Sequence, residues 1–447
     1  MNFIPNASLK KELLSELGVH TIDDLFTDIP KKIRVHHLDL PNGLPQQHVE
    51  EHLRTLAHKN KSAYQLPTFL GGGAQHHYVP AAVKTILSRS EFYTAYTPYQ
   101  PEASQGFLQA IFEYQSIIAE LTGMDIANAS LYDGETALGE AALMATRINK
   151  RNTFLIPKNI SWEKKSVLHN YAKGANLIIK EIPYHQDTGK LNIDLLKKHL
   201  TTDVSAVYIE NPNFFGIFED DATQIYELVK QNQSLYVVGV NPFSLGIMKN
   251  PGEYGADIVI GEGRGLGTPI DFGGSGLGIF ACKQEYVRQL PGRIIGMTKD
   301  TQGKRAFCMT LQTREQHIRR GKATSNICTN EGLYALAAVV YLSWIGGSGL
   351  EELGRINLER GQHLAQEITK IHGFTPRFNA THFNEFVLHY AGDISQLHNK
   401  LLNHGVQGGL HLEHWYPELN NCLLFGVTEA HTDQQIQTFL TTLQEVT

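Results

Sequence analysis

The sequence of 447 residues lacks several features that would place a protein in a specialised class. Lys and Arg total 39 against 45 Asp and Glu, so the net charge is −6, and like charges form no block. That balance argues against nucleic acid or an anionic membrane as the main partner. The start of the chain has no signal-like apolar segment, and no membrane-spanning segment is predicted. We therefore expect a cytoplasmic protein that uses neither nucleic acid nor a membrane as a partner.

Cysteine is scarce, and histidine follows no metal-site spacing. The four cysteines lie too far apart for a CxxC pair, so we expect reduced, mostly buried thiols. The 21 histidines include no HExxH motif, and we predict no metal site. The residues concerned are Cys282, Cys308, Cys328 and Cys422, and the closely spaced histidines His36 and His37, His76 and His77, and His411 and His414.

Short apolar runs alternate with helical segments through the middle of the chain. The runs are continuous rather than alternating, which indicates strands covered on both faces and hence a mainly parallel sheet. The fold class that this pattern predicts is α/β. The runs occupy residues 153–156, 176–182, 204–210, 235–240, 257–261 and 276–281.

Changes in the pattern of predicted helices and strands along the chain divide it into three structural parts. Residues 1–103 read as a helical arm followed by an extended segment, and the arm packs against the rest of the protein or against a second subunit. Residues 104–345 carry the α/β pattern. Beyond Gly346, helices and strands of a smaller α+β unit fill residues 346–447.

A polar turn opens an Ala-rich helix within SLYDGETALGEAALMATR, residues 130–147. Free backbone N–H groups and the hydroxyls of Ser130 and Thr136 at such a helix start form a favourable place for a phosphate. Every helix needs a capped start, however, so an ordinary cap is the alternative.

Tyrosines are concentrated in EFYTAYTPYQPEASQG, residues 91–106, where two prolines hold the chain extended. Buried tyrosine hydroxyls need partners, so tyrosines on a stiff irregular segment favour a pocket or an interface over plain packing. The residues of interest are Tyr93, Tyr96, Tyr99, Gln100 and Glu102.

Nine glycines crowd residues 255–281. Glycine at this density marks turns with positive φ, or backbone that something approaches closely. The stretch is not a dinucleotide-binding GxGxxG motif, because Leu266 stands where the third glycine is required, and the chain has no P-loop.

Four long motifs, taken in order, resemble a known family over essentially the whole chain. They are TAYTPYQPEASQG, LTGMDIANASLYDGETALGEA, GADIVIGEGRGLGTP with FGGSGLGIFA, and REQHIRRGKATSNICTN. They are similar to the alpha subunit, or subunit 1, of the split glycine decarboxylase, the P-protein of the glycine cleavage system. The resemblance implies a fold-type-I pyridoxal-phosphate (PLP) transferase fold, similar to aspartate aminotransferase, for the large domain.

Two positions depart from active fold-type-I enzymes. The strand at 235–240 runs into Asn241, where the resemblance leads us to expect an Asp beside the pyridine nitrogen, and Arg264 holds the position of the Schiff-base lysine. Asn has no carboxylate to keep the ring nitrogen protonated, and Arg forms no imine. The chain is therefore expected to bind no PLP covalently.

The resemblance implies a heteromeric enzyme in which a lysine-bearing beta subunit holds PLP. The expected activity is glycine dehydrogenase (aminomethyl-transferring), an oxidoreductase that decarboxylates glycine and passes the aminomethyl group to the lipoyl group of H-protein. A heterotetramer is expected, in which this chain lends residues to the partner's active site. Those residues are Tyr96, Tyr99, Gln100 and Glu102, and less strongly Thr324, Ser325 and Asn326. The alternatives are a silent scaffold or regulator with this fold, and an independent aminotransferase or cysteine desulfurase, which the missing lysine opposes.

Overall fold

The computed structural model describes residues 6–35, 37–63, 65–270 and 273–447. The chain divides into two compact units, Met1–Lys61 and Ser62–Thr447, which we describe separately. The domain boundaries predicted at 103 and 345 stay predictions.

The first unit is a series of short helices, as its sequence predicts. Thr21 begins one of them with a capping box, in which its hydroxyl accepts from the Asp24 N–H and the Asp24 carboxylate accepts from the Thr21 N–H. Most large apolar side chains of this unit are exposed. Its elements are η1 (Ala7–Leu9), α1 (Lys10–Glu16), η2 (Ile22–Phe26), η3 (Lys31–Ile33) and α2 (Gln46–Ala57).

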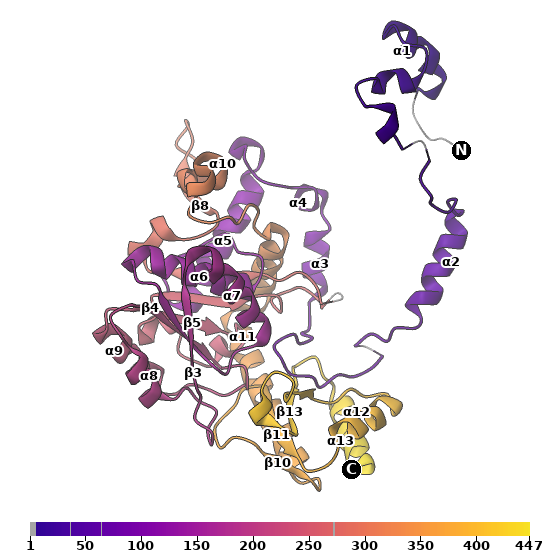
Figure 1. The fold of residues 1–447 in the computed structure, drawn as a ribbon. Helices are drawn as coiled ribbons and strands as arrows, with labels where there is room; N and C mark the ends of the chain where they lie inside the picture. Colours follow the sequence, from indigo (N-terminus) through magenta and orange to yellow (C-terminus); the bar gives the residue numbers. More distant parts are fainter. Residues whose placement is uncertain (1–5, 36, 64, 271–272) are drawn as a thin grey trace. The chain divides into compact units, whose positions relative to one another are not determined.

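A mainly parallel sheet forms the centre of the second unit (Figure 1). In the described part of the chain its strand order is β1-β7-β6-β5-β4-β2-β3, in which β3, β2, β4, β5 and β6 are parallel and β7 is antiparallel to both of its neighbours, β6 and β1. The fold predicted from the apolar runs is thus confirmed. The strands are β1 (Ile126–Ala127), β2 (Thr153–Pro157), β3 (Ile178–Ile182), β4 (Val204–Asn211), β5 (Leu235–Val240), β6 (Ile258–Glu262) and β7 (Gly278–Cys282).

Alternate residues of the central strands pack into two different cores. In β2, Leu155 belongs to one core, whereas Phe154 and Ile156 belong to the other. Helices therefore cover both faces of the sheet, which explains why its central strands are mostly apolar on both faces. The first core is covered by α5 (Gln105–Thr122), α8 (Ile193–His199), α9 (Ala222–Gln231) and the first half of α11 (Gly332–Thr369), and the second by α6 (Gly134–Asn149) and α7 (Trp162–Ala175).

Helix α11 crosses the boundary predicted near residue 345 and is broken there. Gly346 adopts φ 64°, a left-handed conformation that interrupts the helix. By length and composition alone, α11 is apolar enough to cross a membrane, and it is the one such helix among the described residues. Ala335, Leu336 and Ala338 of its first half are buried in the protein core, as expected for a core helix.

A smaller antiparallel sheet with two helices forms the C-terminal part of this unit, where Phe425 and Phe439 belong to one core. Phe69 lies in the same core, and its carbonyl accepts from the Gly426 N–H at 3.0 Å. The segment around Phe69 thus packs with the C-terminal elements. They are β10 (Phe374–Pro376), β11 (Glu385–Tyr390), α12 (Ile394–Asn403), β12 (Leu410–His411), β13 (Cys422–Gly426) and α13 (Asp433–Val446).

A β-hairpin packs against helix α5. It is formed by β8 (Ile294–Lys299) and β9 (Arg305–Thr310), and the sequence pattern does not predict it. The side-chain amides of Gln105 and Gln115 each exchange two hydrogen bonds with the backbone of one hairpin strand. The remaining elements are α3 (Ala81–Leu87), α4 (Ser90–Tyr93), η4 (Pro101–Ala103), η5 (Ser244–Gly246), η6 (Pro251–Tyr254), η7 (Gln284–Gln289), η8 (Gln312–Arg314), α10 (Gln316–Arg319), η9 (Arg320–Lys322) and η10 (Pro417–Leu419).

Candidate functional site

A cavity of about 440 Å³ lies at the carboxyl ends of the parallel strands. Residues at or just after the ends of β4, β5 and β6 line it, among them Asn213, Asn241 and Glu262. Open α/β sheets bind ligands at this edge, because the loops after the strands meet there. Glu385 of β11 also reaches the cavity, so the smaller sheet contributes to its wall.

The carboxylate of Glu262 lies at the N-terminus of α6. Its Oε2 accepts from the Gly134 N–H at 3.0 Å, and its Oε1 accepts from the backbone N–H groups of Arg264 and Leu277, each at 2.8 Å. Asp133 caps the same helix, accepting from the Thr136 N–H at 2.6 Å. Two acidic side chains therefore satisfy the helix start, where the macrodipole favours negative charge.

Glycines permit this close packing around α6, as the glycine-rich stretch predicts. A Cβ on Gly134 would lie 3.2 Å from the Glu262 Cβ. A Cβ on Gly276 would lie 2.6 Å from the Asp133 Cβ, and one on Gly278 would lie 2.6 Å from the Asp133 carbonyl oxygen. The expectation that something approaches this backbone closely is confirmed, and what approaches it is the start of α6.

Lys164 lines the cavity, although it is absent from the residues that the sequence analysis selects. Its Nζ lies 2.5 Å from Oε1 of Glu210, which also accepts from the Tyr208 hydroxyl at 2.8 Å. Burial by itself lowers the pKa of Lys164, but Glu210 and Glu135 outweigh that effect and raise it. Lys164 is thus held as an ammonium. Its one signal in the sequence is its place in the first turn of a helix that follows a buried strand.

The structure brings the two substituted positions, Asn241 and Arg264, into the wall of this cavity. Asn241 follows β5, and its Oδ1 accepts from the Phe243 N–H at 3.0 Å. The Arg264 Nε donates to the Ser275 carbonyl at 3.1 Å. Neither side chain offers the carboxylate or the amine that active enzymes of this fold are expected to have at these positions.

The predicted phosphate-site hydroxyls lie around α6, but partly in structural roles. Ser130 is buried with φ 109°, and its Oγ accepts from the Glu331 N–H at 3.0 Å, so it ties α6 to the start of α11. The Thr136 backbone is occupied by the Asp133 cap. Their role in phosphate binding stays a prediction.

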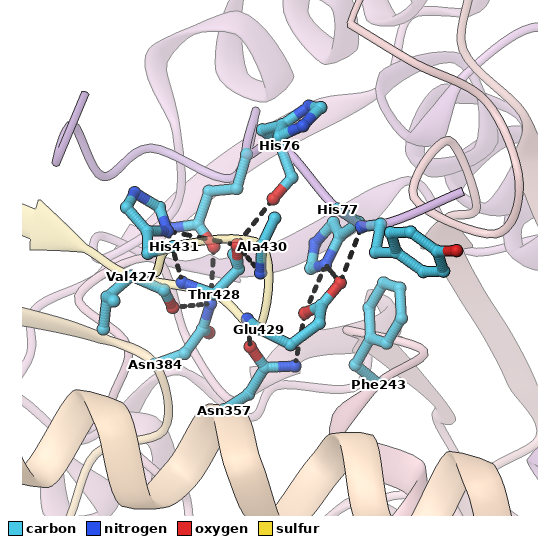
Figure 2. A network of polar contacts seen from close by, with 12 residues as sticks. His76, His77, Phe243, Asn357, Asn384, Val427, Thr428, Glu429, Ala430 and His431 are labelled. Carbon is cyan, nitrogen blue, oxygen red and sulfur yellow. Dashed lines mark hydrogen bonds and ion pairs between the residues drawn. The ribbon is translucent and has the colours of Figure 1, made fainter. Parts of the chain in front are cut away.

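A buried His–Glu pair joins the wall of the cavity to the C-terminal elements (Figure 2). His77 Nδ1 lies 3.1 Å from both carboxylate oxygens of Glu429, and the His77 ring stacks on Phe243 with 4.0 Å between centroids. The Asn357 side chain donates to Glu429 Oε2 at 3.0 Å and accepts from the Glu429 N–H at 2.9 Å. Backbone N–H of Tyr78 donates to Oε1 at 2.9 Å.

This network controls the ionisation of Glu429. Burial would raise its pKa, but the facing His77 and the hydrogen bonds from His77, Tyr78 and Asn357 together lower the pKa to about 2. Glu429 is therefore charged at neutral pH, and its charge holds together segments more than 350 positions apart in the chain.

The tyrosine segment lies away from this cavity. Tyr96 is 78% exposed and Tyr99 is 52% exposed, and neither they, Gln100 nor Glu102 is among the residues that line the cavity. Arg293 lies beneath Tyr99: its guanidinium is 5.6 Å from the ring centroid, and it donates to the Tyr99 hydroxyl at 3.4 Å.

Arg293 also connects the tyrosine segment with the segment before Thr324. Its Nε lies 3.7 Å from Glu315 Oε2, and the ring of His317 meets Tyr99 edge to face at 5.9 Å. Further along, the Thr324 N–H donates to the Arg314 carbonyl, and Ser325 Oγ accepts from the Ile327 N–H. No hydrogen bond of the Asn326 side chain occurs among the contacts of the described residues. Thus Tyr99 of the tyrosine segment lies beside the residues that precede Thr324, Ser325 and Asn326 in the chain.

Among the described residues, no group of three or more His, Cys, Asp or Glu is arranged to hold a metal ion, and His36 lies outside those residues. All four cysteines are unpaired. Cys282 and Cys422 are buried, Cys308 is partly buried and Cys328 is exposed.

The sheet order, the two helical layers and a cavity at the strand ends define a fold-type-I PLP-dependent enzyme fold. Glutamate decarboxylase of Lactobacillus brevis shares it with a TM-score of 0.68 at 14% identity, over 93% of this chain and 95% of that one. Sphingosine-1-phosphate lyase of Burkholderia pseudomallei shares it with a TM-score of 0.67 at 12% identity, over 93% of each chain.

More specifically, the chain belongs to the glycine cleavage system P-protein family, whose model matches residues 1–443. It is 46% identical to the probable glycine dehydrogenase (decarboxylating) subunit 1 of Desulfitobacterium hafniense, over 100% of both chains. It is 46% identical to the protein of the same name from Thermococcus kodakarensis, over 100% of this chain and 98% of that one. A crystal structure of glycine decarboxylase (P-protein) in inhibitor-bound form matches with a TM-score of 0.92 and 40% identity over both full lengths. The family expected from the sequence motifs is confirmed.

The residues of the cavity do not fit PLP. Arg264 forms no imine, Lys164 is paired with Glu210, and Glu262 already lies at the helix start that would receive a phosphate. Carboxylates outnumber cations among the described lining residues, which opposes a dianionic phosphate. The carboxylates belong to Asp133, Glu135, Glu163, Glu210, Glu262 and Glu385, and the cations are Lys164 and Arg264.

Proposed function

We propose that this chain is the lysine-free subunit of a two-subunit glycine decarboxylase, glycine dehydrogenase (aminomethyl-transferring). A partner beta subunit carries the Schiff-base lysine and PLP. Together the subunits decarboxylate glycine and transfer its aminomethyl group to the lipoyl group of H-protein in the cytoplasm. The observation that carries the proposal is a fold that the P-protein family model matches over residues 1–443, and whose cavity offers Arg264 and a paired Lys164 in place of a reactive lysine.

In this enzyme the tyrosine segment reaches the active site of the partner. Its support is the exposure of Tyr96 and the anchoring of Tyr99 by the buried Arg293, which presents ordered aromatic side chains to a neighbouring chain. Gln100 and Glu102 belong to the same segment. Thr324, Ser325 and Asn326 follow the segment that Arg293 and His317 bring beside Tyr99 and are the weaker contributors.

Reconstitution tests the proposed function. Glycine-dependent CO₂ exchange with H-protein should be absent for this chain alone and should appear when a lysine-bearing beta subunit is added. The co-expressed pair should elute at roughly 200 kDa, as a tetramer of two chains of each kind. Full exchange by the beta subunit alone would instead identify this chain as a silent scaffold, and exchange by this chain alone would identify an independent enzyme.

The isolated chain should form no stoichiometric imine with PLP, because Glu210 keeps Lys164 protonated and Arg264 is never nucleophilic. Borohydride reduction in the presence of PLP, followed by peptide mapping, should find only trace labelling of exposed lysines. The beta subunit, treated identically, is the positive control and should yield one pyridoxyl-lysine per chain. Complete labelling of Lys164 would contradict this prediction.

A further inference from the structure

The start of α6 already contains a carboxyl group supplied by the chain itself, whose pKa is raised by burial and lowered by the N–H donors of Leu277 and Gly134. This helix is 16 residues long, and its N-terminal partial positive charge faces the carboxylate of Glu262. Three backbone N–H donors converge on that carboxylate from three different parts of the chain: Gly134 begins α6, Arg264 follows β6, and Leu277 precedes β7. This is the donor set with which helix starts and adjoining loops bind phosphates.

We propose that Glu262 is a built-in substitute for a ligand phosphate, which excludes PLP and other phosphate compounds from the cavity and fastens α6 to the ends of β6 and β7. The proposal goes beyond the absence of an imine, because it concerns non-covalent binding of any phosphate at this position. It also gives Glu262 a structural role, since the same three donors would be left unsatisfied if the site were empty.

The backbone packs closely around Glu262 at the start of α6. A Cβ on Gly276 would lie 2.8 Å from Glu262 Oε2, so the backbone closes directly over the carboxylate. On its other side, Asp133 has taken the Thr136 N–H. A phosphate could reach the Gly134 N–H only by displacing Glu262, and it would then meet the negative charges of Asp133 and Glu135.

Removal of Glu262 should convert the position into an anion site, and the full chain without any partner can show this. We expect Glu262→Ala to melt about 3–8 °C below the wild type, because three donors lose their acceptor. Roughly 20 mM inorganic phosphate should then raise the melting temperature of the variant by about 2–4 °C more than NaCl of equal ionic strength. The wild type should show no phosphate-specific gain. PLP fluorescence titration should likewise saturate with the variant and not with the wild type.

Glu163→Ala is the matched control, since it removes one carboxylate from the same cavity without touching the donors of α6. It should show no phosphate-specific gain. Glu262→Ser, which retains a small acceptor, replaces the alanine variant if the latter does not fold. A phosphate-specific gain in the wild type, an equal gain in Glu163→Ala, or no gain in either Glu262 variant would overturn the proposal. None of these measurements depends on glycine decarboxylation or on a beta subunit, so they leave the proposed function untouched.

Discussion

Replacing Glu429 by alanine is expected to lower the free energy of unfolding by about 3–5 kcal/mol, because it removes the carboxylate of a buried His–Glu pair and leaves its donors without an acceptor. Both side chains are nearly inaccessible, with 9% of His77 and 6% of Glu429 exposed. The donors from His77, Tyr78 and Asn357 would all lose their acceptor in one step. Urea-induced unfolding of the purified chain, followed by circular dichroism, measures the change.

The chain contains a matched exposed pair that serves as the control. His411 Nε2 lies 3.2 Å from Glu413 Oε2, almost the same separation, but 36% and 48% of the two side chains are exposed. Glu413→Ala should therefore cost less than about 1 kcal/mol. Equal effects at Glu413 and Glu429 would show that burial of the His77 pair contributes nothing.

Acid dependence gives an independent check on the same pair. The pKa of Glu429 is lowered in the folded chain to about 2, from its ordinary value of 4.5, so its contribution to stability is complete above pH about 4.5. That contribution, up to about 3 kcal/mol, is lost as the pH falls from about 4.5 towards about 2. The Glu429→Ala variant should lack this part of the acid dependence, so its stability should approach that of the wild type at low pH.

The strands of the large sheet are predictable because their signal is local. A strand in the middle of an α/β sheet is mostly apolar on both faces, and β4 and β5 appear in the sequence as largely apolar runs within one residue of their observed bounds. The helix stop at Gly123 is equally local, since this residue adopts the left-handed conformation with φ 68°.

The wall of the cavity is not predictable in this way, because its contacts join distant parts of the chain. His77 and Glu429 are 352 positions apart, and Lys164 and Glu210 are 46 apart, so no spacing rule connects them. Phe69 similarly belongs to the core of elements that begin after residue 370. The resemblance does single out Asn241 and Arg264, but only the structure shows that they share one cavity with Glu262.

The largest effect on catalysis is expected at Tyr96. If its hydroxyl donates a hydrogen bond near the reacting centre of the partner subunit, Tyr96→Phe removes that bond and retains the ring. A cost of about 1–3 kcal/mol would reduce turnover roughly five- to hundred-fold. Because 78% of Tyr96 is exposed in the single chain, the same change should leave the melting temperature of that chain nearly unchanged.

Glycine-dependent CO₂ exchange of the reconstituted enzyme, measured together with thermal unfolding of the same assembly, separates catalysis from packing at Tyr96. Tyr93→Phe is the matched control, because this tyrosine ends α4 only three residues earlier and is 70% exposed. Exchange by the Tyr93 variant should stay within about two-fold of the wild type. Unchanged exchange in Tyr96→Phe would refute its catalytic role. A fall in exchange that is matched by a fall in the stability of the assembly would show instead that Tyr96 fills the interface, since a hydroxyl that acts only on the reaction lowers turnover without loosening the subunits.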